Sequence, residues 1–227
     1  MKNLELISFE IVNCCNLSYL HPWCPSNSLL RYDDAATPPM SDNDIIRFIR
    51  SALAHGFIGK IAYHYYCEPT QDLPRCQRLA VAIKALGLRS VLWTNGTCRG
   101  LPEGIFDEIF VTAYGLGQEG ITRRIEYRPD DRLQIYDIEP LIGITPCYRP
   151  AYLEMPITFY GDVRLCCADW RGTIKIGNII TNKHSEIFTA WRNIGKLAIA
   201  GTPEICRRCH ALAKTPGITD GEFRIWR

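Results

Sequence analysis

The sequence lacks the features that would assign it to a membrane, a nucleic acid or a fibrous assembly. No stretch reaches the roughly 18 apolar residues that a membrane-spanning helix needs. No basic block stands out, and the formal net charge is only +2, so the charge does not predict a nucleic-acid or membrane partner. Internal repeats and low-complexity tracts are also missing. We therefore expect an ordinary globular protein, and 47% hydrophobic residues suffice for its core.

A secretory signal is not expected either. The first ten residues carry Glu5 and Glu10 inside their apolar run and offer no small-residue cleavage site. This favours a cytoplasmic, reducing location, where disulfide frameworks are rare. The chain has 11 cysteines, and an odd count does not suit a complete set of disulfides. The clustered thiols therefore predict metal or redox chemistry.

The first two-thirds of the chain alternate strand-like with helix-like segments. The predicted strands are Leu4–Val12, Lys60–Tyr66, Ser90–Thr94 and Glu108–Thr112. Helices are predicted after the N-cap Ser41 up to Gly56, and from Leu79 to Leu86 before Gly87. This alternation predicts an α/β fold with a parallel sheet, in which ligands bind at the carboxyl ends of the strands.

After about residue 143 the pattern changes. Pro156–Tyr160 and Val163–Cys167 flank Gly161-Asp162 and predict a β-hairpin. His184–Ala198 predicts a helix with one apolar face, formed by Ile187, Trp191, Ile194 and Leu197. Residues 115–141 receive no assignment. We therefore expect two domains, 1–143 and 144–227.

Four cysteines of the last third form a spaced set: Cys147, Cys166, Cys206 and Cys209. Four thiolates complete either a 4Fe–4S cluster or a tetrahedral zinc site. A zinc ribbon prefers two Cys-x-x-Cys pairs, and only Cys206–Cys209 is present. Zinc stays an alternative. Cys167 is either a fifth participant or a buried neutral thiol.

This spacing resembles a known family. The run Cys147-(x)13-Gly161-(x)4-Cys166, followed by Cys206-(x)2-Cys209, is similar to the SPASM auxiliary-cluster domain of radical S-adenosylmethionine (SAM) enzymes. No further cysteine follows Cys209, which resembles the Twitch subtype with its single auxiliary cluster. The resemblance implies a partial, shortened TIM-like (β/α) barrel with a small C-terminal β-hairpin plus helix iron–sulfur domain. It also implies that the four thiolates bind an auxiliary 4Fe–4S cluster.

The same family places a Cys-(x)3-Cys-(x)2-Cys loop for a second cluster, which binds SAM, after the first strand. Cys15 and Cys24 match the two ends of this loop, but His21 stands where the second cysteine belongs. A neutral imidazole ligand raises the reduction potential relative to thiolate, which works against SAM cleavage. Cys14 or Cys67 could supply the third thiolate instead. The other interpretation is that His21 is an ordinary loop residue and no cluster forms here.

Further segments resemble the SAM pocket of the family. Glu68-Pro69 stands at the motif whose glutamate meets the SAM amino group, but Tyr66 and Cys67 replace the two glycines that allow close backbone approach. Two other strand ends supply the remaining candidates for SAM binding, which are Thr94, Asn95 and Thr112.

The resemblance implies an enzyme that forms a 5′-deoxyadenosyl radical and abstracts hydrogen from a small-molecule or partner-presented substrate. It is similar to the aminocyclitol dehydrogenase type of butirosin biosynthesis, in which the auxiliary cluster accepts an electron. The implied cofactors are SAM and one or two 4Fe–4S clusters, with a reducing partner such as flavodoxin or ferredoxin. The alternative is a degenerate relative that has lost SAM cleavage and acts in electron transfer or binding.

Overall fold

The computed structural model describes residues 4–20, 24, 26, 38–113, 123–126, 154–167, 169, 172 and 174–199. Its strands are β1 Leu6–Phe9, β2 Lys60–Tyr63, β3 Arg89–Thr94, β4 Glu108–Ala113, β5 Arg123–Glu126, β6 Glu154–Ile157, β7 Asp162–Arg164 and β8 Lys175–Asn178. Its α-helices are α1 Asp42–Ala54, α2 Leu73–Ala85 and α4 His184–Ile199, and its 3-10 helices are η1 Ser18–Leu20 and η3 Pro69–Asp72. No helix in these ranges is long and apolar enough to cross a membrane.

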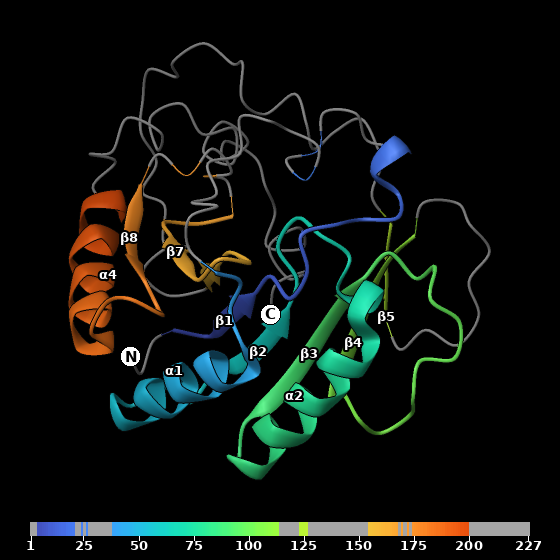
Figure 1. Cartoon of the computed structure of the whole chain (residues 1–227), viewed down its shortest axis with the longest axis horizontal. Coiled ribbons are helices and arrows are strands. Elements are labelled where there is room, and N and C mark those ends of the chain that lie inside the picture. Colours follow the sequence, from blue (N-terminus) through green and yellow to red (C-terminus); the bar gives the residue numbers. More distant parts are fainter. Residues whose placement is uncertain are drawn as a thin grey trace.

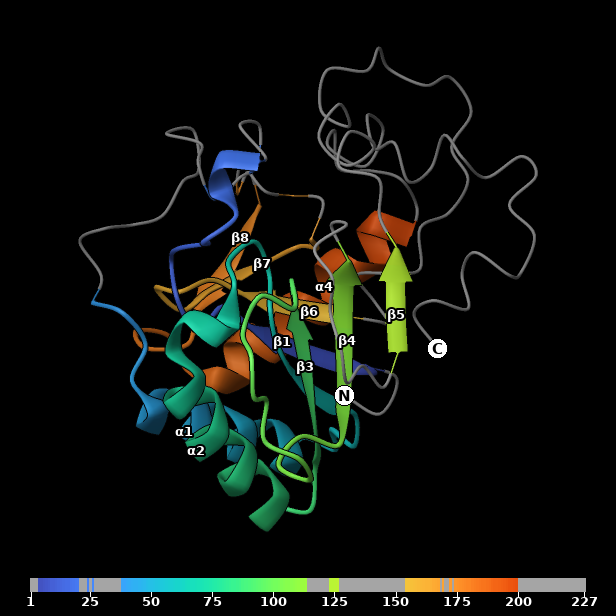
Figure 2. The same cartoon turned by 90° about the vertical axis from the view of Figure 1, so that its right-hand side faces the viewer.

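The strands form one sheet in the order β5-β4-β3-β2-β1-β6-β7-β8. Strands β1 to β5 pair in parallel, and β6 joins the other side of β1, also in parallel. Over the described residues β5 and β8 are the edges, so the sheet is open rather than a closed barrel. The predicted α/β fold with a partial, TIM-like barrel is confirmed. Figure 2 shows β3, β4 and β5 pointing the same way.

The predicted helix after Ser41 is confirmed, and its cap is the reason it begins there. The Ser41 hydroxyl accepts a hydrogen bond from the backbone N–H of Asp44, and the Asp44 carboxylate accepts one from the Ser41 N–H. Helix α2 begins at Leu73, earlier than predicted, because Asp72 caps it and Pro74 occupies its first turn. Figure 1 shows α1 and α2 together on one side of the sheet.

The predicted hairpin is present as β6 and β7, which pair in antiparallel fashion at Ile157 and Val163. Both strands are shorter than predicted, and Asp162 belongs to β7 rather than to the turn. Gly161 takes a left-handed backbone, with φ 84°. No pattern in the sequence indicates that β6 pairs with β1, and this pairing carries the sheet across residue 143. The division into domains at that residue stays a prediction.

Helix α4 confirms the predicted helix of residues 184–198 and lies beside β8 (Figure 1). Ile187 and Trp191 are buried as expected, and Phe188 lies between them in the same core. Leu197 is 47% exposed, so the prediction that it belongs to the buried apolar face was wrong. The contact with the sheet ends about one turn before this residue, where Ile194 is only partly buried.

Successive side chains of a strand alternate between the two faces of a sheet. On one face Ile7, Phe9 and Tyr63 belong to the main core, which also contains the buried residues of α1 and α2. On the other face a small apolar cluster contains Leu6, Ala62, Val91 and Phe110. We call this second side the inner face, because helices α1 and α2 do not cover it.

Candidate cluster and cofactor site

The loop after β1 carries the first candidate ligands for a cluster. Cys15 is half-buried and Cys14 is exposed. The Cys15 carbonyl accepts a hydrogen bond from Ser18 at 3.3 Å, which starts η1. Cys24 is half-buried as well, and its Sγ accepts a hydrogen bond from Ser26 Oγ at 3.1 Å. His21, the third expected ligand, lies outside the described residues.

Cys15 lies near both Cys24 and a carboxylate. Burial raises the pKa of the Cys15 thiol, and the negative charges of Glu68 and Cys24 raise it further. A hydrogen bond from the backbone of Leu17 acts in the opposite direction. Cys15 and Cys24 are therefore close enough to interact electrostatically. A metal ion binds a cysteine as the thiolate and so replaces the thiol proton.

Glu68 is the centre of a hydrogen-bonded cradle at the ends of β2 and β3. Its Oε1 accepts bonds from the Thr70 N–H at 3.1 Å, the Thr70 hydroxyl at 2.6 Å and the Thr94 hydroxyl at 2.6 Å. Its Oε2 accepts one from the Asn95 N–H at 2.7 Å. Burial raises the pKa of Glu68, and these hydrogen bonds partly counter that rise. Glu68 is only 3% exposed, and these hydrogen bonds orient its carboxylate.

The cluster loop is tied to this cradle. The Glu68 N–H donates to the Cys14 carbonyl at 3.1 Å. Asn95 Nδ2 donates to Asn16 Oδ1 at 2.8 Å and lies 3.9 Å from Cys15 Sγ. Asn16 Nδ2 in turn donates to Thr97 Oγ1 at 2.7 Å. The chain's own side chains therefore bind the loop after β1 to the turn after β3.

Four of the five candidates for SAM binding meet at this cradle. Glu68, Thr94 and Asn95 are joined by the bonds above, and Pro69 begins η3 beside them. Thr112 is buried on β4, one position beyond Val111, the register partner of Thr94. An ammonium group suits Glu68 Oε2, which accepts one hydrogen bond from the described residues where Oε1 accepts three. The chemistry of this donor set therefore fits the amino group of SAM.

Tyr66 and Cys67 fill the positions of the family's two glycines, and Tyr65 precedes them. The Tyr66 hydroxyl donates to the carbonyl of Cys167, next to the candidate ligand Cys166. Burial raises the pKa of Tyr65 well above its usual value, and the charges of Cys166 and Cys167 add to this rise. The connection after β2 thus contacts the segment that follows β7. Sequence reasoning noted Tyr66 only as a departure from the family and missed this contact.

Of the four predicted ligands for the auxiliary cluster, the described residues include only Cys166, which is half-buried after β7. The others, Cys147, Cys206 and Cys209, lie outside them. Cys67 is buried and Cys167 is half-buried. Within the described ranges no three cysteine, histidine or acidic side chains are grouped closely enough to hold a metal ion.

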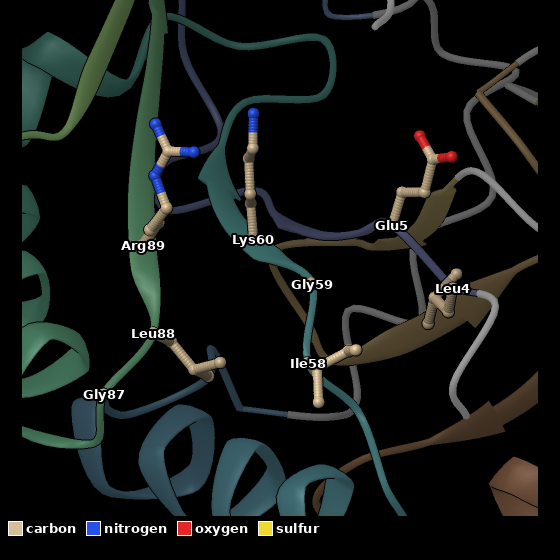
Figure 3. Close-up of a pocket in the computed structure, with 8 residues that line it drawn as sticks. All are labelled: Leu4, Glu5, Ile58, Gly59, Lys60, Gly87, Leu88 and Arg89. Carbon is tan, nitrogen blue, oxygen red and sulfur yellow. The ribbon is translucent and has the colours of Figure 1, made fainter.

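A cavity of about 440 Å³ lies at the amino ends of the strands, opposite to the candidate cluster site. Its lining residues stand where β1, β2 and β3 begin: Leu4, Glu5, Ile58, Gly59, Lys60, Gly87, Leu88 and Arg89. Figure 3 shows Lys60 and Arg89 extending to the same side, and both form ion pairs with Glu108. Ligands of parallel sheets bind at the carboxyl ends of strands, so this cavity is separate from the candidate site.

Comparisons with known proteins agree with this arrangement. Residues 146–210 match the SPASM family, described as an iron–sulfur cluster-binding domain. An open α/β sheet with a SPASM domain is the combination that the resemblance to radical SAM enzymes implied, and this resemblance is confirmed. A comparison with curated proteins gives no match.

Among solved structures, the chain is similar to BtrN in complex with AdoMet and 2-DOIA, at a TM-score of 0.70 and 19% identity. The match covers 91% of this chain and 93% of that one. It is also similar to selenomethionine BtrN in an open conformation, at a TM-score of 0.61 and 22% identity over 91% and 92% of the two chains. The protein therefore has the fold of BtrN.

Proposed function

We propose that this protein is a radical SAM enzyme that oxidises a polar substrate, with an auxiliary 4Fe–4S cluster as electron acceptor. SAM bound at a reduced cluster supplies a 5′-deoxyadenosyl radical, which abstracts a hydrogen atom from a substrate carbon. The substrate is a small molecule or a residue presented by a partner, and a flavodoxin or ferredoxin in the cytoplasm supplies the electron.

One observation carries the proposal. Cys15 lies beside the Glu68 cradle and interacts electrostatically with Cys24, although Cys15, Glu68 and Asn95 follow three different strands. A thiol pair next to an oriented carboxylate suits a cluster and the amino group of SAM. Asn95 and Asn16 hold the loop in place, and Thr94 fixes the carboxylate.

A second candidate function is a degenerate relative without SAM cleavage. The observation in its favour is that Tyr66 does not leave the open backbone of the family's glycines but bonds to Cys167. In that case the SPASM domain would serve electron transfer or binding. The two candidates differ in whether the loop of Cys15 holds a cluster.

Replacing Cys15 and Cys24 together by serine distinguishes them. We expect anaerobic reconstitution to give about eight irons per wild-type chain and about four in the double variant, because one of two 4Fe–4S clusters is lost. Formation of 5′-deoxyadenosine should stop, while the absorbance of the auxiliary cluster stays. Cys76→Ser is the matched control. An unchanged iron count in the double variant would contradict the proposal.

A further inference from the structure

A buried polar group on the inner face is not used by the SAM site. Ser8 of β1 donates its hydroxyl hydrogen to Glu154 Oε1 of β6 at 2.7 Å. His64, directly after β2, has Nε2 3.5 Å from the same oxygen. Ser8 and Glu154 are 0% and 3% exposed, and the His64 side chain is 14% exposed. Glu154 is the register partner of the apolar Leu6, and a buried carboxylate is costly unless it has partners.

The imidazole is held in one orientation. Its ring stacks on Trp93 with centroids 4.7 Å apart and planes at 28°. Trp93 stacks in turn on Phe110 at 4.5 Å and 17°. The backbone of His64 is held as well, because its amide N–H donates to the Phe9 carbonyl at 3.2 Å. The row from Glu154 to Phe110 thus crosses five neighbouring strands and fixes the ring against rotation.

His64 lies at the same end of the strands as the candidate SAM site. It directly follows the carboxyl end of β2 and stands four residues before Glu68 on the same connection. In TIM-like folds catalytic side chains come from this edge. A histidine oriented by a carboxylate is the usual arrangement of a general base.

We propose that His64 binds the hydroxyl on the reacting carbon of the substrate and accepts its proton, and that Glu154 and Ser8 position His64. The inference rests on the proposed function. Oxidising a secondary alcohol to a ketone breaks one C–H and one O–H bond. The hydrogen atom goes to the deoxyadenosyl radical, one electron to the oxidised auxiliary cluster, and the proton to His64. The imidazolium then lies beside the Glu154 carboxylate.

The test compares the reconstituted wild type with His64→Gln, Glu154→Gln and Ser8→Ala. The probes are 2-DOIA and a panel of cyclitols and aminocyclitols. One readout is probe affinity by calorimetry with SAM present, and the other is carbonyl product per 5′-deoxyadenosine. His55→Gln, an exposed histidine at the end of α1, is the matched control. Circular dichroism and thermal melts verify folding.

We expect His64→Gln to bind the best probe up to about 10-fold more weakly, because the hydrogen bond between the imidazole and the substrate hydroxyl is lost. Glu154→Gln should weaken binding in the same direction, because the imidazole loses the carboxylate that positions it. The product ratio of His64→Gln should fall by about 100-fold, the usual contribution of a general base. Ser8→Ala should lower it less, and His55→Gln should match the wild type.

The inference is overturned if His64→Gln keeps both values within about twofold, since a base contributes far more, or if no probe binds the wild type. Failure of the proposed function is a different result. The wild type would then make no 5′-deoxyadenosine, while the affinities of the four variants would still decide whether His64 forms a binding site.

Discussion

Burial raises the pKa of the Cys15 thiol, and the negative charges of Glu68 and Cys24 raise it further. A raised pKa disfavours the thiolate, and binding of a metal ion would favour it because the metal replaces the thiol proton. The side chain therefore makes sense as a ligand rather than as a free nucleophile. Cys14 is exposed next to it, which favours Cys15 as the first ligand of the loop.

His21→Cys tests directly whether His21 is a ligand of the cluster in the loop after β1. A thiolate lowers the reduction potential of a cluster relative to imidazole, so we expect a more negative midpoint potential and faster formation of 5′-deoxyadenosine. Redox titration followed by electron paramagnetic resonance gives the potential. A potential that does not move would show that His21 is not a ligand.

Cys76 and Cys98 belong to neither group of candidate cluster ligands, and we expect them to differ in reactivity. Burial raises the pKa of Cys76 to about 12, so almost no thiolate is present at pH 8. Cys98 is only half-buried. We expect iodoacetamide to label Cys98 well before Cys76 in the native protein, as measured by peptide mass spectrometry. Equal labelling rates would contradict the packing of α2, and denaturation should abolish the difference.

At the scale of elements, helix α1 depends on its cap. Burial alone would raise the pKa of Asp44, but hydrogen bonds from Ser41 and the neighbouring Arg47 outweigh it and lower the pKa. We expect Ser41→Ala to reduce the free energy of unfolding by about 1 kcal/mol, measured by urea denaturation. Ser51→Ala, within the same helix, is the control.

The cap also has a pH dependence of known sign. Because the pKa of Asp44 is lowered on folding, its contribution is complete above the unfolded pKa. It is lost as the pH falls through the lower, folded value. The difference between wild type and Ser41→Ala should therefore shrink in acid. A difference that grows towards low pH would contradict the capping box.

Local sequence patterns made these elements predictable, whereas the pairings of distant segments were not predictable. The capping box and the apolar spacing of α1 lie within one segment, so periodicity suffices to find them. Strand β6 pairs with β1, and nothing near either strand encodes that partner. The cradle of Glu68, Thr94 and Asn95 could be expected, since the carboxyl ends of adjacent parallel strands meet. The pairing of His64 with Glu154 depends on β6 lying next to β1, so it could not be expected from the sequence.

At the scale of the whole molecule, the open sheet joins the two thiol-bearing regions. Strand β6 lies between β1, whose loop carries Cys15, and β7, which leads to Cys166. Tyr66 adds a direct contact between the connection after β2 and Cys167. The segment matching SPASM is thus continuous with the sheet that holds the candidate SAM site. This organisation suits an enzyme in which one electron passes from substrate to an auxiliary cluster.

The measurement that tests the central claim most directly is the fate of SAM. The reconstituted protein is reduced with dithionite under anaerobic conditions, given SAM, and analysed by liquid chromatography and mass spectrometry. The account predicts 5′-deoxyadenosine in the wild type and none in the Cys15→Ser, Cys24→Ser double variant. A fully reconstituted wild type that binds SAM but forms no 5′-deoxyadenosine would contradict it.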